Sequence, residues 1–548
     1  MSQATSPAPT RTDDAARSET GAMSHREILE ALSGLLVAMF VAILSSTVVT
    51  NALPTIVADL DGSQTGYTWV LVATMLAMTA TTPIWGKLAD LFSKKMLMQV
   101  ALVVYTAGSA LAGLAQSMEW LIAARVVTGL GVGGVMALIQ IIIGSMVSPR
   151  ERGRYSCYIG ASFGLATLIG PLVGGVIVDS ALGWRGCFYV GLPFAVVAFV
   201  VLQAKLHLPT VKREVHIDYL GSVLIMGGVS LLLIWVSLAG QQFDWLSTTT
   251  VLMVGGGLVV LALAALVEGK VARQPIIPLQ LFRDRTIALA TVAAVLVGVA
   301  MLTATTYLSE YFQNSRGMTP TTAGLMSLWM VLGLMATSIV SGRRISATGR
   351  WRVWLVWGMA AVVVGSGLLA TIDHTTPLWR VAASMLVLGG GLGATQQNLI
   401  LAVQNNVDQA NIGAASSVVA FFRTLGGAIG VSAFGAVLAH RVTTHVTDGV
   451  TSLVQSGRIT PEQASSLSGD SLPSVALLRE PLRSLFEGAF GDATGQIFLF
   501  TVPCAVLALV AVLFIKEKSL RTTLDQLEEP EVAVETAAQL QVGELSAR

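Results

Sequence analysis

The sequence predicts an all-α polytopic membrane protein, and three observations support this fold class. Hydrophobic residues make up 53% of the 548 residues and charged residues only 12%, whereas a soluble protein carries about 25% charged residues. Apolar runs long enough for membrane helices recur along the chain without the alternation typical of a β-barrel. Lysine and arginine gather in short connections between these runs, as they do in cytoplasmic loops of membrane proteins.

The apolar runs predict the number and position of the spans. A membrane-spanning helix needs about 20 mostly apolar residues, and the polar segment before residue 28 holds no such run, so no signal peptide is expected there. Fourteen spans are predicted, at 28–51, 68–87, 97–115, 121–146, 155–178, 186–204, 219–239, 248–268, 286–312, 321–341, 353–371, 379–404, 412–439 and 494–515.

The basic residues predict the orientation of these spans. Counted from a cytoplasmic N-terminus, the loops on the inner side carry clusters of Lys and Arg, such as the loop with Arg150, Arg152 and Arg154. The short outer loops carry only Arg185, Arg316 and Arg380. Short loops rich in Lys and Arg stay in the cytoplasm. We therefore expect both termini to be cytoplasmic.

Two inner turns indicate an internal repeat. Residues 86–95 read GKLADLFSKK and residues 342–352 read GRRISATGRWR, and both lie between apolar spans. Eight predicted spans separate them, two more than a simple repeat of six helices would place there. The excess predicts a pair of helices inserted between two six-helix halves, and internal duplication is expected of a secondary transporter.

This pattern predicts the domain organisation. We call residues 28–204 the N-terminal half and residues 271–515 the C-terminal half. The full expectation is a disordered cytoplasmic tail at 1–27, a six-helix bundle at 28–204, two inserted helices at 205–270, a second six-helix bundle at 271–515 that includes an extracellular loop at 440–493, and a cytoplasmic tail at 516–548.

Several motifs carry a family resemblance. GKLADLFSKK resembles the signature turn of the major facilitator superfamily. LIAARVVTGLGVGG at 121–134, LIGPLVGG at 168–175 and LSSTVVTNALP at 44–54 are similar to motifs of its fourteen-span drug:proton antiporters. The resemblance implies a major facilitator fold and a multidrug efflux antiporter of the bacterial plasma membrane. No Walker A sequence is present, so direct use of ATP is not expected.

The resemblance also implies roles for particular residues. The signature turn implies a gate latch, in which an Asp binds the positive end of a helix in the other half. The fourth-helix Arg, Arg125, is implied in proton coupling, and its alternative is an Arg that reaches the outer headgroups. The latch residues are Gly86, Asp90, Lys94 and Lys95, and the antiporter motif of the fifth helix is Gly170, Pro171, Gly174 and Gly175.

The signature turn and the first helix depart from the family pattern. Leu91 replaces the Arg that follows the family's Asp, and Ser93 replaces its second Gly. Ser45 occupies the position of an intramembrane Asp that many relatives have, and serine does not titrate. Either the coupling differs from that of these relatives, or a proton carrier lies elsewhere, at Glu310 first, then Asp179, then Glu268. For Glu310, the alternative is an outer residue in contact with water.

Polar and aromatic residues within the spans are candidates to contact a substrate in a central cavity. Each of them has a structural role as its alternative. The candidates are Ser45, Thr47, Asn51, Gln140, Tyr307, Trp329, Gln396, Gln397 and Asn398.

Three functions remain open at this point. The first is proton-coupled export of amphipathic drugs, antibiotics or dyes. The second is dedicated export of one native metabolite, lipid or siderophore. The third, a membrane enzyme or channel, lacks a clustered catalytic set, because the six histidines are scattered and the three cysteines show no metal or disulfide spacing. We expect no metal, cofactor, nucleic acid or obligate protein partner, and we expect the substrate, protons and membrane lipid as partners.

Overall fold

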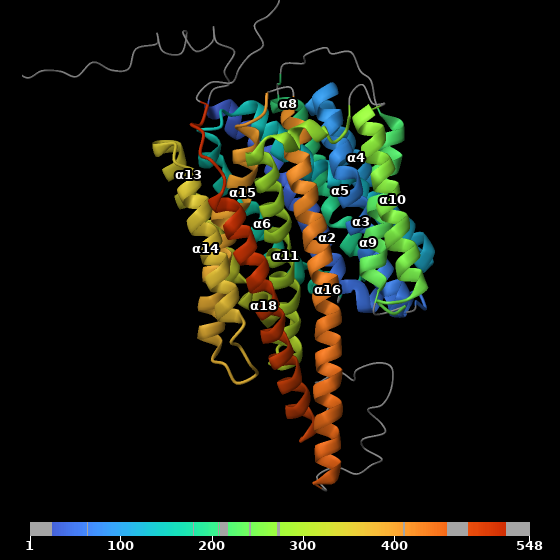
Figure 1. Ribbon diagram of the computed structural model, residues 1–548. Helices are drawn as coiled ribbons and strands as arrows, with labels where there is room; N and C mark the ends of the chain where they lie inside the picture. The colour runs from blue at the N-terminus through green and yellow to red at the C-terminus, as the bar shows by residue number, and fades with distance from the viewer. Residues whose placement is uncertain are drawn as a thin grey trace, which may run out of the picture.

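The computed structural model describes residues 25–62, 64–178, 180–206, 208, 218–239, 243–270, 275–408, 411–456 and 480–521. Within this part of the chain the regular structure is helical, with no strand, which confirms the predicted fold class (Figure 1). The helices are α2 (His25–Asp59), α3 (Gln64–Leu91), α4 (Lys94–Gly113), α5 (Met118–Met146), α6 (Arg152–Val178), α7 (Gly186–Tyr189), α8 (Gly191–Lys205), α9 (Tyr219–Leu238), α10 (Thr248–Lys270), η1 (Leu279–Arg283), α11 (Arg285–Glu310), η2 (Tyr311–Ser315), α12 (Pro320–Met326), α13 (Leu328–Thr348), α14 (Arg352–Leu369), α15 (Leu378–Gln404), α16 (Ile412–Gln455) and α18 (Leu482–Leu513).

The helices coincide with the predicted spans. In the described residues, thirteen helical segments are long and apolar enough to cross a membrane. The remaining predicted span, 155–178, is the 27-residue helix α6, which packs between α2 and α13. Two predicted spans are broken helices, because α7 leads directly into α8 and α12 leads into α13.

Local sequence explains where several helices begin and end. The Asp284 carboxylate caps α11 by accepting the backbone N–H groups of Thr286 and Ile287, which would otherwise lack partners. At the other end of α13, Gly349 adopts a left-handed φ of 73°, a conformation that glycine tolerates at a helix C-terminus.

The segment expected as an extracellular loop, 440–493, begins and ends within helices. Helix α16 continues to Gln455 and α18 begins at Leu482, so the two helices project together beyond the main body (Figure 1). Leu438, Val442 and Val446 recur every four residues and pack against Phe486 and its neighbours on α18. This spacing forms one apolar helix face, which is why the helices do not end at the expected span limits.

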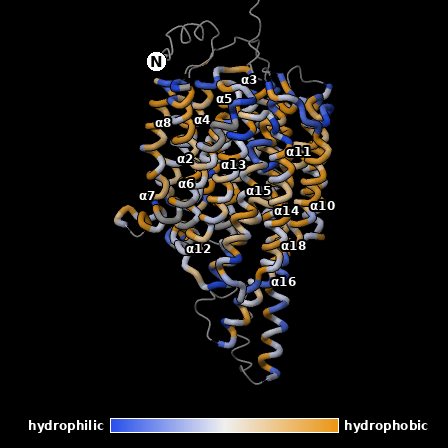
Figure 2. Tube along the Cα trace, turned by 90° about the vertical axis from the view of Figure 1, so that its left-hand side faces the viewer, coloured by the Kyte–Doolittle hydropathy of each residue, from blue (hydrophilic) through white to orange (hydrophobic). Residues whose placement is uncertain are grey.

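The hydrophobic core forms two large clusters, one drawn from residues 28–206 and one from residues 287–520. A smaller cluster joins the inserted helices α9 and α10 to α3 and α16, through side chains such as Val229, Ala80 and Phe421. The main contacts between the halves are α3 with α16 and α6 with α13. Figure 2 shows hydrophobic residues along the length of the helices. The domain limits themselves stay a prediction.

Helix α2 starts at one end of the molecule, and the last described residues, after α18, lie at the same end (Figure 1). Helix α16 also begins there. At this end Lys205 pairs with Glu30 at 2.9 Å, and the Trp351 indole donates to the Lys518 carbonyl at 3.0 Å. We call this the inner end, and its cytoplasmic position stays a prediction.

Candidate functional site

The Asp90 carboxylate joins the two halves at the inner end. Its Oδ1 accepts the N–H of Gly413 at 2.9 Å and its Oδ2 accepts the N–H of Ala414 at 2.8 Å. These are amides of the first turn of α16, which have no partner inside the helix. The preceding residue, Asn411, makes no capping hydrogen bond with its side chain. Asp90, 323 residues away from Gly413, therefore acts as the cap of α16 and places its negative charge at the positive end of the helix.

The residues around Asp90 allow this close approach. A Cβ atom on Gly86 would collide with the Ser417 side chain on α16, so glycine is required for the helices to meet. Ser93, which departs from the family's glycine, has a local role as the N-cap of α4 and accepts the N–H of Met96. Lys95 donates to the Gln203 carbonyl at 2.7 Å and so ties the turn to its own half.

A second set of hydrogen bonds joins the halves beside this one. Arg152 is only 5% exposed. Its guanidinium donates to the Gln404 side chain at 2.6 Å, to the Val147 carbonyl at 2.8 Å and to the Gly144 carbonyl. The Gln404 amide donates in turn to the Ser416 hydroxyl at 2.7 Å. This network connects α5 and α6 to α15 and α16 and was not expected from the sequence, where Arg152 was assigned only to a basic loop.

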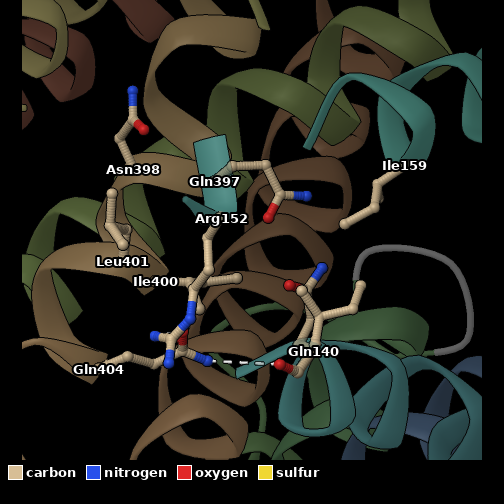
Figure 3. Close-up of a pocket in the computed structure, with 9 residues that line it drawn as sticks. Gln140, Arg152, Ile159, Gln397, Asn398, Ile400, Leu401 and Gln404 are labelled. Carbon is tan, nitrogen blue, oxygen red and sulfur yellow. Dashed lines mark hydrogen bonds between the residues drawn. The ribbon is translucent and has the colours of Figure 1, made fainter. Parts of the chain in front are cut away.

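A small cavity lies against this network, between α5, α6 and α15 (Figure 3). Its volume is about 20 Å³, which is room for about one water molecule. Three predicted substrate residues line it, namely Gln140, Gln397 and Asn398. A drug-sized ligand needs a site of about 300–1,000 Å³, so this cavity is too small to hold such a ligand.

Helix α6 contacts the C-terminal half through glycines outside the antiporter motif. Gly170 faces α2, where a Cβ atom would collide with Thr47 of the same half, and Gly175 faces open space. Gly160 and Gly164 face α13 instead, and a Cβ on Gly164 would collide with Val331. The spacing of small residues four apart is the sequence signal that could have found this contact.

Arg125 is buried within the N-terminal half. Its side chain is 2% exposed, which excludes the alternative of a side chain that reaches the headgroups. Its Nε donates to the Val70 carbonyl of α3 at 3.5 Å, so the partner is a backbone oxygen. Ser45 is also 2% exposed, and its hydroxyl has no hydrogen-bond partner among the described residues.

Two aromatic candidates occupy different positions. The Tyr307 side chain is 3% exposed and belongs to the cluster of α16 and α18, where its hydroxyl donates to the Val431 carbonyl. It packs inside the protein in this conformation, and its expected substrate contact stays a prediction. Trp329 on α13 is 44% exposed. Gln396 is half-buried next to the cavity residues Gln397 and Asn398.

The predicted proton carriers differ in their surroundings. Glu310 is half-buried at the end of α11, immediately before the π-helical turn η2, and its carboxylate makes no hydrogen bond or ion pair within the described residues. Glu268 accepts the N–H groups of Ile276 and Ile277, each at 2.9 Å, which makes it an anchor for the segment after α10. Asp179 lies outside the described residues.

For two further candidates, Pro171 and Asn51, the structure describes the helix but not the side chain. The remaining latch residue, Lys94, is the first residue of α4, and Gly174 is buried within α6.

Arg423 on α16 was missed as a functional candidate by the sequence analysis. It is half-buried, and in the described part of the chain it makes no hydrogen bond or ion pair. An arginine in the middle of a predicted span, 412–439, was the available signal, because such residues tend to be functional.

Comparisons with known proteins agree with this architecture. A family model described as Major Facilitator Superfamily matches residues 35–431. The chain is 34% identical over 502 residues to "Efflux pump dotC" of Dothistroma septosporum, covering 91% of this chain and 85% of that protein. It is 32% identical over 451 residues to "Multidrug transporter protein MdtP" of Bacillus subtilis, covering 82% of each. The solved structure of the proton:xylose symporter XylE matches with a TM-score of 0.59 at 13% identity, over 91% of this chain and 98% of that one, a likeness of fold alone.

Proposed function

Because the chain belongs to the Major Facilitator Superfamily and is therefore an integral membrane transporter of small molecules, we propose that it exports amphipathic compounds across a bacterial plasma membrane by proton-coupled alternating access. The observation that carries this proposal is the pair of hydrogen bonds from Gly413 and Ala414 to Asp90. They close the inner end between the halves and can break without unfolding either half.

The inner hydrogen bonds act as a gate. The Asp90 pair, the Arg152–Gln404 bond and the bonds from Arg150 to the carbonyls of Ser346 and Ala347 all lie at the inner end. On this proposal these bonds close the inner end, and export requires a second conformation in which they are broken. Substrate enters from the cytoplasm in the second conformation and leaves outward from the first.

Glu310 is the proposed proton carrier. It lies 25 residues beyond Arg285, the first residue of α11, which is about 38 Å at 1.5 Å per residue. The carboxylate is thus near the outer end of the span, where protons arrive under an inward gradient. Among the residues that the structure describes, no hydrogen-bond or ion-pair partner holds it in the charged form, which leaves the carboxylate able to bind and release a proton.

The test combines Glu310→Gln with a protonophore. In a pump-deficient bacterial host, we expect the wild type to expel an amphipathic dye, and the protonophore to stop this efflux. Glu310→Gln is expected to lose uphill efflux and to retain downhill exchange of dye. Asp492→Asn, which changes an exposed acid on α18, is the matched control. Normal uphill efflux by Glu310→Gln would show that Glu310 is not the proton carrier. Efflux that persists with the protonophore would show that the protein is not a proton antiporter.

A dedicated exporter of one native compound is the second candidate. Ser45, which takes the place of a first-helix acid, is buried and uncharged, so the first helix offers no carboxylate at this depth to bind the cationic drugs of many relatives. Resistance to a single compound class in the same host, rather than to several, would favour this candidate.

A further inference from the structure

We propose that the substrate of this transporter carries an acidic group, and that Arg423 of α16 binds that group in the middle of the membrane. This inference rests on the proposed export function and names the substrate class for it.

Arg423 lies at mid-depth in the membrane. It is 11 residues beyond Ile412, the first residue of α16, which is about 17 Å at 1.5 Å per residue. The hydrocarbon core is about 30 Å thick, so the backbone of Arg423 lies near the centre of the bilayer. A charge at that depth is costly and is normally paired or faces a polar path.

The register of α16 directs Arg423 toward the space between the halves. Ser416 accepts the Gln404 amide at 2.7 Å, and the same amide donates to the Gln140 carbonyl at 3.4 Å. Ser416 therefore faces the junction of α5, α15 and α16. Arg423 follows seven residues later, and residues seven apart differ by only about 20° around a helix. It thus lies on the same face, two turns deeper than the inner gate.

The residues beside Arg423 on this face are small. Ala420 precedes it by three residues and Gly427 follows it by four, so they are its nearest neighbours on the helix surface. Arg423 itself is half-buried, in contrast to the nearly fully buried Arg125. Side chains this small place no bulky group of α16 between the guanidinium and the space between the halves.

Among the described residues, no carboxylate pairs with either of these arginines. Arg423 has no ion pair there, and the hydrogen bond of the Arg125 side chain goes to a backbone carbonyl. The carboxylates of Asp90, Glu268 and Glu310 lie at helix ends, and the first two are already bound to backbone amides. The deep charges are therefore positive. A carboxylate, sulfonate or phosphate on the substrate would complete a bidentate pair with Arg423, whereas a cation would be repelled.

Transport of three matched probes tests this inference. Each probe is a dansyl group on an undecyl chain, and the chains end in a carboxylate, a primary amide or a trimethylammonium group. Purified full-length protein in liposomes with an imposed pH gradient should move the carboxylate at least tenfold faster, in kcat/KM, than the trimethylammonium probe. Arg423→Gln should lower the ratio of carboxylate to amide transport about tenfold. Arg423→Lys, which keeps the charge, should retain most of this ratio.

Arg441→Gln is the control, because Arg441 is an exposed residue of the same helix. If Arg423→Gln loses transport of all three probes equally, Arg423 has a structural role and the inference is overturned. An unchanged ratio of carboxylate to amide transport would overturn it as well. If the wild type moves only the amide or ammonium probe, the acidic substrate class is wrong and the exporter stands. If the wild type moves none of the three, the exporter proposal fails and this inference fails with it.

Discussion

Asp90→Asn should open the inner end of the transporter. The substitution keeps the size of the side chain and removes its charge. In the native protein each carboxylate oxygen accepts one amide of α16, from Gly413 at 2.9 Å and from Ala414 at 2.8 Å. Asparagine has one acceptor oxygen, so its NH₂ group would face one of these amides and leave it without a partner.

The structure sets the size of this effect. A hydrogen bond to a charged group contributes about 1.5–3 kcal/mol, and a negative charge at a helix N-terminus contributes about 0.3–1 kcal/mol. Losing one such bond together with the charge should destabilise the closed conformation by about 2–4 kcal/mol. Since about 1.4 kcal/mol is tenfold in an equilibrium constant, the inner-open population should rise about 30-fold to 1,000-fold.

The assay is cysteine labelling from the inner side. Ile143 lines the cavity beside the gate and is 6% exposed. Ile143→Cys, placed in a protein whose three native cysteines are replaced by alanine, should react with a membrane-impermeant maleimide in inside-out vesicles at a rate that follows the open population. Asp90→Asn is expected to accelerate labelling by about 30-fold or more.

Asp284→Asn is the matched control. Asp284 also caps a helix with two amides, at 2.7 and 3.2 Å, but within its own half. Its substitution should lower thermal stability and leave the labelling rate unchanged. If Asp90→Asn labels at the wild-type rate, or if Asp284→Asn accelerates labelling as much, the inference that Asp90 closes the gate is refuted.

Three further predictions concern contacts at the gate and elsewhere in the helix packing. Gly86→Ala should reduce efflux strongly, because its new Cβ collides with the Ser417 side chain and also lies 2.9 Å from the Gly413 carbonyl. The double variant with Ser417→Gly should recover only part of the efflux, and wild-type efflux by Gly86→Ala alone would contradict the close-approach argument. Glu268→Ala should lower the melting temperature of the detergent-solubilised protein, because two backbone amides lose their acceptor at about 1–3 kcal/mol each, and an unchanged melting temperature would remove its anchoring role. Gly164→Ala should impair transport because its new Cβ collides with Val331 on α13, and adding Val331→Ala should restore transport. Equal transport by the wild type, the single variant and the double variant would show that α6 and α13 can move apart without loss of function.

The candidate site was predictable only in part. The signature turn led to Asp90 and to a helix N-terminus in the other half as its partner, but α16 could not be chosen, because nothing in the sequence links residue 90 to residue 413. Ser45 and Tyr307 were selected for their polarity within apolar spans, and both are buried in packing positions. Arg152 was assigned to a loop, yet its guanidinium binds Gln404 across the halves.

The sequence by itself determined the membrane fold, the positions of the helices and the clustering of basic residues in particular loops, because these depend on the composition of short segments and on the thickness of the bilayer. Only the tertiary structure decided which polar side chains face the space between the halves. The rotation of each helix about its axis is set by how it packs against its neighbours. The partners of Gly86, Asp90 and Arg152 lie hundreds of residues away in the sequence, and no local pattern specifies how the helices that carry them are rotated.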